Sequence, residues 1–129
     1  MIGVMEKEVS KLVEKFRQIE IGISSEKGDF GLFALIERED SLGKWDIVVA
    51  AKWIGKADKE LINAIADKTR KTLSKDEQLM LSRIVILPTS DPLVKSLNLI
   101  GAEHSSIGLS NTSFNGIVIK EAYLITSKR

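Results

Sequence analysis

The sequence contains no cysteine, one histidine (His104) and two prolines among its 129 residues. Without cysteine the chain has no disulfide framework, thiol nucleophile or cysteine-ligated zinc site, and a single histidine excludes paired-histidine metal centres. Aromatic residues make up only 5%, and nineteen basic residues are balanced by eighteen acidic ones, for a net charge of +1. This balance argues against a protein whose binding to nucleic acid or membranes is driven by charge.

Long hydrophobic runs are also missing from the sequence. No apolar run is longer than that from Ile47 to Ala51, which has the length of a buried strand and is far below the ~18 residues that a membrane span requires. Charges enter at once at Glu6–Glu8, which is not typical of a signal peptide. We therefore expect a cytoplasmic protein with no membrane partner, folded as a single domain over residues 1–129.

The N-terminal part of the chain changes its hydrophobic period. Over Met5–Ile19, apolar residues recur at three- and four-residue spacing, which predicts an amphipathic helix. Over Ile19–Ile23 the period falls to two, which predicts a half-buried strand, followed by a turn in which Gly28 takes a positive φ. With strands at Phe30–Glu37 and Trp45–Trp53, the prediction is a three-stranded antiparallel meander after a helix.

The third of these strands carries its large apolar residues on one face. These are Trp45, Ile47, Val49, Ala51 and Trp53, and their spacing predicts a face that packs beneath a helix. An alternative is that the two tryptophans form a stacking platform for bases or sugars. We favour the core interpretation, because proteins that stack bases usually combine aromatic residues with positive charge.

The middle of the chain indicates two helices. One runs from Asp58 to about Lys71, and the basic cluster at its end suits the negative end of the helix dipole better than it indicates a phosphate site. Ser74–Glu77 matches a capping box and predicts a short helix that carries Leu79–Leu81.

The remaining elements complete the predicted fold. Ile84–Leu87 indicates a strand buried on both faces, Pro92–Ile100 a helix, and Asn115–Gly116 the turn of a C-terminal hairpin that ends in a strand over Ile117–Thr126. We therefore predict an α+β fold, in which a sheet of about five to six strands carries helices mainly on one face.

One arrangement of acidic residues has the spacing of a catalytic or metal-binding pair. If Asp40–Gly43 form the loop of the hairpin, Glu39 lies opposite Lys44 and Glu37 opposite Asp46. The two carboxylates of the second pair would then share a face, with Cβ atoms about 5 Å apart. Such a pair repels, shares a proton or holds a divalent cation. The alternative is a polar hairpin tip whose acids pair with neighbouring cations.

The predicted element order over Glu6 to Leu87 resembles the core of the restriction-endonuclease-like nucleases. That family carries an acid, followed by an acid two residues before a lysine, on neighbouring strands around a metal. Asp46 and Lys52 match this motif in type, but Ala50 stands where the second acid belongs. The resemblance covers about two-thirds of the chain and rests on topology.

This resemblance implies a hydrolase that depends on magnesium or manganese. Its metal ligands would be Asp46 with Glu37 or Glu39, and Lys44 would be the catalytic cation. Outside this alternative, the sequence predicts no cofactor and no nucleic-acid partner.

Two further positions are candidates for binding or catalysis. Ser90 and Asp91 follow a predicted strand and precede a helix, where α/β proteins often bind ligands, although such residues also cap helices. His104 stands beside two serines, but no Gly-x-Ser-x-Gly turn is present to expose a nucleophile.

With no convincing catalytic constellation, we favour a non-enzymatic binding or assembly module. Its partner would be another protein or a second copy of the chain, with a homodimer formed through the C-terminal hairpin or another exposed strand edge. The apolar residues on both faces of Ile117–Ile125 motivate this hypothesis. The nuclease-type hydrolase is the alternative.

Overall fold

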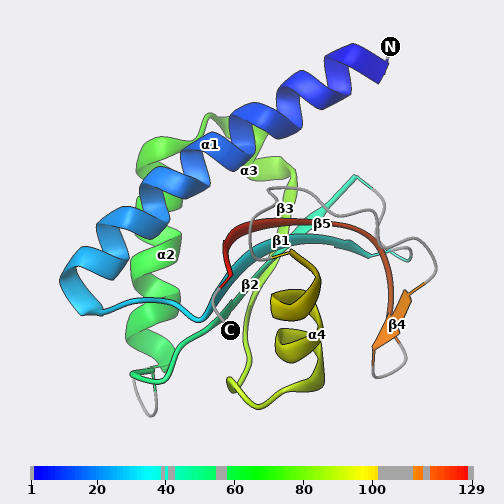
Figure 1. Cartoon of the computed structure of the whole chain (residues 1–129). Helices are drawn as coiled ribbons and strands as arrows, with labels where there is room; N and C mark the ends of the chain where they lie inside the picture. The colour runs from blue at the N-terminus through cyan, green and yellow to red at the C-terminus, as the bar shows by residue number, and fades with distance from the viewer. Residues whose placement is uncertain are drawn as a thin grey trace.

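The protein is an α+β fold in which helices cover a mixed sheet, as predicted (Figure 1). The computed structural model describes residues 2–38, 40, 43–54, 58–101, 112–114 and 117–127. The helices in this part of the chain are α1 (Ile2–Lys27), α2 (Asp58–Thr72), α3 (Lys75–Leu79) and α4 (Pro92–Gly101). The strands are β1 (Leu32–Arg38), β2 (Trp45–Ala50), β3 (Leu81–Ile86), β4 (Thr112–Phe114) and β5 (Ile117–Ser127).

The strands lie in the order β3-β2-β1-β5-β4. β1 pairs antiparallel with both β2 and β5, and β5 pairs antiparallel with β4. β3 runs parallel to β2, which requires a long crossover connection, and α2 and α3 lie in that connection. β1 is therefore the middle strand, and β3 forms one edge of the sheet.

The N-terminal helix is longer than predicted, and the prediction of a strand at Ile19–Ile23 is wrong, because this segment belongs to the helix. α1 continues to Lys27, with Ile19 and Ile23 buried and Ile21 62% exposed. The buried pair continues the stripe of Leu12 and Phe16, which stand seven residues earlier in the same helical pattern. The alternating isoleucines thus lie on two sides of a helix, and the predicted three-stranded meander is the β1–β2 hairpin alone.

Gly28 ends α1 in the left-handed conformation that the sequence predicted, although it joins a helix to a strand. Its φ is +125°, and its N–H donates to the Ser24 carbonyl at 2.9 Å. A Cβ at this position would lie 2.9 Å from Cδ1 of Trp53, whose indole N–H donates to the Asp29 carbonyl at 2.8 Å. Both the backbone angle and the close approach of Trp53 therefore require glycine.

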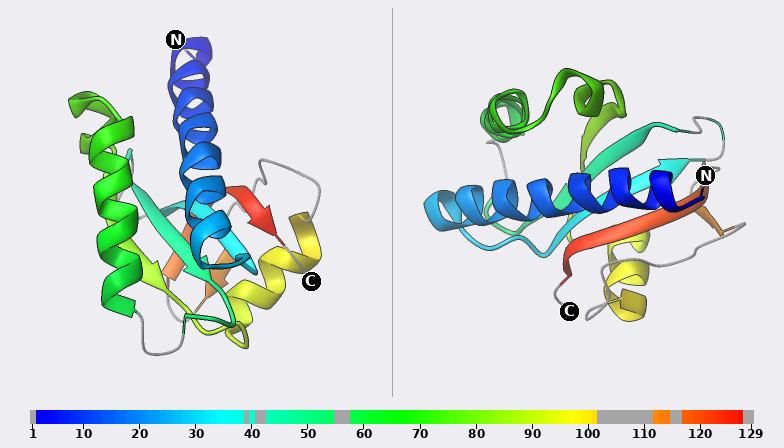
Figure 2. Two further views of the ribbon diagram at one scale, coloured as in Figure 1. Left: turned by 90° about the vertical axis from the view of Figure 1, so that its left-hand side faces the viewer. Right: turned by 90° about the horizontal axis from the view of Figure 1, so that it is seen from above.

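The core lies on both faces of the sheet, with two helices on one face, in keeping with the predicted arrangement of helices mainly on one face, and one helix on the other. In Figure 1, α1 lies above the sheet and α4 below it, and Figure 2 shows the same arrangement from two further sides. α1 and α2 cover one face, which carries Phe33 and Leu35 of β1. α4 covers the other face with Val94 and Leu97, against Ile36 and its neighbours.

The predicted apolar face of the third strand is confirmed, although the strand ends at Ala50 and Trp53 lies in the turn that follows it. Trp45, Ile47, Val49 and Ala51 are buried in the core beneath α1 and α2, and Trp53 packs against it. The ring of Trp45 lies 5.3 Å from that of Tyr123, and Trp53 lies 5.4 Å from Phe30, centroid to centroid. Trp45 is thus buried in the core and Trp53 packs against Phe30 at its margin, which contradicts a stacking platform formed by both rings.

β3 confirms the strand predicted at Ile84–Leu87 but corrects its burial. Ile84 and Ile86 contact the core beneath α1 and α2, and Val85 and Leu87 contact the core beneath α4. The apolar residues Ile84–Leu87 are only half-buried, because β3 is an edge strand rather than an inner one. α3 ends at Leu79, which is 66% exposed, so the prediction that Leu79–Leu81 all lie on this short helix is also wrong.

The C-terminal hairpin is confirmed by strand pairing. Phe114 of β4 lies opposite Ile117 of β5 in an antiparallel pair, and the predicted turn residues Asn115 and Gly116 lie outside the described residues. β5 agrees with the predicted strand within a residue, and it pairs along the length of β1. α2 and α4 likewise agree with the predicted helices.

Alanine substitutions in the last turns of α1 test whether the segment Ile19–Ile23 is a helix or a strand. We expect Ile19→Ala and Ile23→Ala each to lower the free energy of unfolding by about 2–5 kcal/mol, because both side chains fill the core. Ile21→Ala should lie within about 0.5 kcal/mol of the wild type, since its side chain is exposed. Urea titration measures all three, and equal losses would contradict the helix.

Candidate functional site

The predicted carboxylate pair depends on the register of β1 against β2. The predicted register differs from the observed one by one residue and is therefore wrong. Ile36, and not Glu37, lies opposite Asp46, while Leu35 lies opposite Ile47. A shift of one residue moves a side chain to the other face of a sheet. Glu37 is therefore on the face of Phe33 and Leu35, and Asp46 is on the face of Ile36, so the two acids do not face one another.

The other residues of the proposed metal site make separate contacts. Glu37 is buried, and its Oε2 accepts a hydrogen bond from the Gly43 N–H at 2.8 Å, which closes the turn between β1 and β2. Lys44 Nζ donates to the carbonyl of Leu79 at the end of α3. Glu39 lies outside the described residues.

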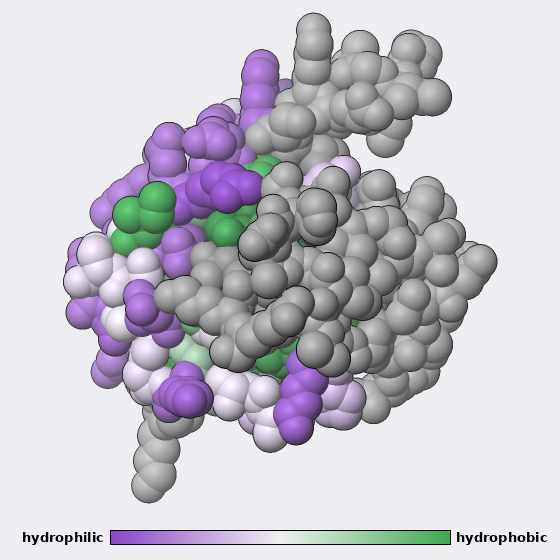
Figure 3. All heavy atoms as spheres, in the orientation of Figure 1, coloured by the Kyte–Doolittle hydropathy of each residue, from purple (hydrophilic) through white to green (hydrophobic). Residues whose placement is uncertain are grey.

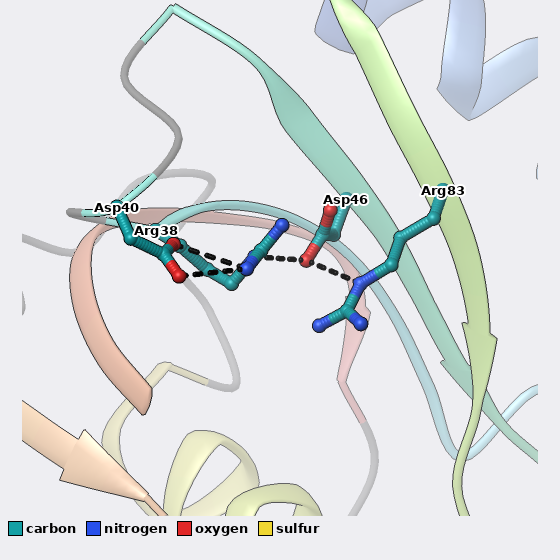
Figure 4. Close-up of polar contacts among 4 residues, drawn as sticks. All are labelled: Arg38, Asp40, Asp46 and Arg83. Atoms are coloured by element: carbon teal, nitrogen blue, oxygen red, sulfur yellow. Dashed lines mark hydrogen bonds and ion pairs between the residues drawn. The ribbon is translucent and has the colours of Figure 1, made fainter. Parts of the chain in front are cut away.

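Asp46 is the centre of a cluster of charges drawn from three neighbouring strands (Figure 4). It is 3% exposed, and its Oδ2 accepts from Nε of Arg38 at 2.8 Å and from Nε of Arg83 at 3.2 Å. Arg38 also donates from Nη1 to both carboxylate oxygens of Asp40, at 3.0 and 3.2 Å. The two guanidinium groups compensate the buried carboxylate and tie β1, β2 and β3 together at one end of the sheet.

This cluster is poorly suited to a divalent cation. Two guanidinium groups already contact the carboxylate of Asp46, and a metal ion there would meet their positive charges. Among the described residues, no group of three or more potential acidic or histidine ligands is close enough to hold a metal. The element order behind the nuclease resemblance also differs, since two antiparallel strands follow α1 where three were predicted.

Ser90 and Asp91 precede α4, where Asp91 acts as a cap. Asp91 Oδ1 accepts from the Leu93 N–H at 2.9 Å, and its carbonyl accepts from the Lys95 N–H at 3.1 Å. Ser90 is exposed in the preceding turn. This geometry supports the capping alternative for Asp91. His104 lies outside the described residues.

A cleft that the sequence did not predict opens between α2, α3 and the edge strand β3. Its volume is about 330 Å³. The apolar part of its wall comprises Ile47, Ile62, Ala66, Leu81 and Ile84. The polar part comprises Thr69, Arg70, Gln78, Ser82 and Arg83. The described lining therefore combines an apolar wall with two arginines, a serine, a threonine and an amide.

Thr69 gives this cleft an unusual feature. Its hydroxyl oxygen is buried and has no hydrogen-bond partner among the described residues. A buried hydroxyl without a partner costs about 1–3 kcal/mol, so such groups are rare in native proteins. A ligand that reached this hydroxyl would remove the penalty.

The wall of the cleft at α3 is held in place by a capping box and an ion pair. The Ser74 hydroxyl accepts from the Glu77 N–H at 3.2 Å, and Glu77 Oε1 accepts from the Ser74 N–H at 2.8 Å, as the sequence predicted. Lys15 of α1 donates to the same carboxylate at 2.5 Å. The hydrogen bond from Lys15 is the main cause that holds the pKa of Glu77 below its ordinary value, and the bond from the Ser74 N–H is the second.

Sequence reasoning missed the cleft because its residues come from distant segments. The local pattern placed Leu81 on the short helix, so Ser82 and Arg83 were not recognised as strand residues. The pairing of β3 with β2 is also irregular here, since the register shifts between Trp45 and Ile47. The sequence feature that comes closest to indicating the cleft is the pair Ser82 and Arg83, a polar and a basic residue directly before the apolar run Ile84–Leu87.

Compared with known proteins, the chain matches no family model, no curated protein and no solved structure. Within the part of the chain that is described, no helix combines the length and the apolar character needed to cross a membrane.

Removing the charge of Asp46 tests the cluster. We expect Asp46→Asn to lower the free energy of unfolding by about 1–3 kcal/mol, because a neutral amide does not compensate Arg38 and Arg83. Glu37→Gln is the matched control. Its amide oxygen still accepts from the Gly43 N–H, so a loss below about 1 kcal/mol is expected. Equal losses in urea titrations would contradict a central role of Asp46.

The lowered pKa of Glu77 predicts a dependence on pH. Ionised Glu77 stabilises the fold above its ordinary pKa of 4.5, and this contribution is lost as the pH falls through the lower pKa of the folded state. Lys15→Met removes the main cause of the lowered pKa of Glu77. Between pH 7 and pH 3 the Tm of this variant should therefore fall less than the Tm of the wild type. The difference should correspond to less than about 1 kcal/mol in the free energy of unfolding. Lys11→Met, at an exposed lysine on the same helix, should follow the wild type. Parallel curves for all three proteins would contradict the assignment.

Proposed function

We propose that this chain is a non-enzymatic binding or assembly module that binds a protein along the outer edge of β3. The observation that carries the proposal is an edge strand bordered by a cleft of mixed polarity. In the described part of the chain, β2 is the only strand that pairs with β3. We include in the proposal a cytoplasmic location, with which the absence of cysteine is compatible.

The backbone of β3 supports the addition of another strand. The Leu87 N–H donates to the Val49 carbonyl at 2.9 Å, so it points toward β2. Because backbone groups alternate in direction along a strand, the N–H and C=O of Ile86 point away from β2. Such outward-facing groups are the usual template for strand addition by a partner chain.

The metal-dependent hydrolase is the weaker alternative. Its two ligands, Glu37 and Asp46, lie on opposite faces of the sheet, and Asp46 already contacts two arginines. A rise in Tm with millimolar magnesium or manganese that Asp46→Asn abolishes would restore this alternative.

A lysine placed at the edge tests the proposed function. Ser82 is exposed on β3 and lines the cleft, and a lysine on an edge strand disfavours pairing with another chain. We expect Ser82→Lys to abolish self-association measured by light scattering, or to abolish retention of a partner from an extract of the source cells. The expected change is a loss of at least about tenfold in affinity.

Ser25→Lys is the matched control for this experiment. It makes the same substitution at an exposed serine that does not line the cleft, so its binding should equal that of the wild type. Binding that survives Ser82→Lys, or a wild type that binds neither itself nor another protein, would overturn the proposal.

A further inference from the structure

The polar side of the cleft carries positive charge. Arg70 and Arg83 line it from α2 and β3, and no acidic residue is among the described residues of its lining. Arg70 is paired with Asp67, but both side chains are largely exposed. An exposed pair of this kind contributes little stability and exchanges readily with another anion. The cleft is therefore complementary to a negatively charged ligand.

Arg83 is the better placed of the two arginines. Its side chain is 48% exposed, and Nε donates to Asp46. Figure 4 shows its two terminal nitrogens pointing away from Asp46, with no bond drawn to them. Because a guanidinium group can donate two parallel bonds to a carboxylate, Arg83 can hold a second carboxylate while it keeps the first.

The apolar wall indicates what accompanies the charge. Ile62 is 37% exposed beside the cleft, and Ile47 and Ile84 also contribute apolar surface. The Thr69 hydroxyl, which is buried without a partner among the described residues, also borders this space. A small anion alone would leave the apolar wall uncovered, whereas a peptide side chain would cover it.

We propose that the α2–β3 cleft binds an extended acidic segment of a partner protein. The segment adds to the outer edge of β3, places a carboxylate on Arg83 and inserts an apolar side chain against Ile62 and Ile84. The inference rests on the proposed function and specifies the partner's chemistry. Backbone bonds to the edge provide general affinity, and the carboxylate and the apolar side chain provide specificity.

The outer side of α1 and α2 is a less suitable surface for such a partner. In Figure 3 the described surface over these helices is mostly hydrophilic, which is typical of a solvated face. The cleft instead combines an apolar wall, the buried Thr69 hydroxyl that has no partner among the described residues, and two partly exposed arginines.

A random heptapeptide phage library, selected on the purified full chain, tests the inference. We expect the recovered peptides to be enriched in Asp or Glu together with Val, Ile or Leu. A synthetic peptide of the recovered consensus should bind the wild type in a fluorescence anisotropy titration. Arg83→Gln should weaken its binding by about 10- to 100-fold, because a charge-assisted hydrogen bond is lost. Arg17→Gln, which removes the same charge from α1, should bind as the wild type does.

A pair of substitutions at Ile62 tests the site without disturbing Asp46. Both substitutions remove the apolar contact of Ile62, but Ile62→Glu also places a negative charge beside the cleft, so it should weaken peptide binding by at least about tenfold more than Ile62→Lys does. Equal effects of the two substitutions, or acidic peptides that bind Arg83→Gln normally, would overturn the inference.

The outcomes also separate the inference from the proposed function. Recovery of basic or uncharged peptides whose binding is lost in Ser82→Lys would overturn the inference and leave the function intact. If the chain self-associates through Ser82 and no peptide is recovered, the edge binds a second copy of the chain. This result would also overturn the inference and leave the proposed function intact. Absence of both binding and self-association would overturn the two together.

Discussion

Strands β1 and β2 must be covered on both faces of the sheet, and the arrangement of the other elements depends on this constraint. Every residue of β2 and all but the last of β1 are buried. Phe33, Leu35 and Ile47 need cover on one side, and Ile36 and Val48 on the other. A single layer of helices would leave half of this apolar surface in water. α1 and α2 therefore lie on one face and α4 on the other, with β3 and β5 beside the hairpin.

The candidate binding surface lies where this cover ends. β3 contacts both cores through alternating side chains, so the strand is firmly attached by its faces. Its outer edge borders the cleft, and the cluster around Asp46 holds its first half through Arg83. A rigid edge loses little conformational entropy when another strand is added, which favours binding by the edge over binding by a loop. The same arginine therefore links the scaffold to the proposed partner site.

Features encoded by neighbouring residues were predictable from the sequence. The capping box at Ser74, the helix that follows Asp91 and the hairpin before β5 depend on local spacing, and each was predicted. The segment Ile19–Ile23 was mispredicted because five residues fit a period of two and a period of 3.6 almost equally well. The preceding stripe at Leu12 and Phe16 decides between them, since it continues through Ile19.

The site was less predictable because it depends on distances that no local pattern contains. The register of β1 on β2 was derived from an assumed loop length, and an error of one residue separated Glu37 from Asp46. The partners that Asp46 has instead, Arg38 and Arg83, lie eight and thirty-seven residues away. The second of these contacts exists only because the chain crosses over to place β3 beside β2.

Asp46 also has a consequence for how the hairpin reaches its native pairing. If β2 slipped by one residue along β1, Asp46 would turn toward Phe33 and Leu35 and would enter the apolar layer beneath α1 without an arginine beside it. A carboxylate buried without a partner is far more costly than a displaced methyl group. A purely apolar strand could tolerate several alignments, but this one cannot. Asp46 therefore makes the misaligned pairing of β1 and β2 unfavourable once the helices cover the sheet, and so favours the native register.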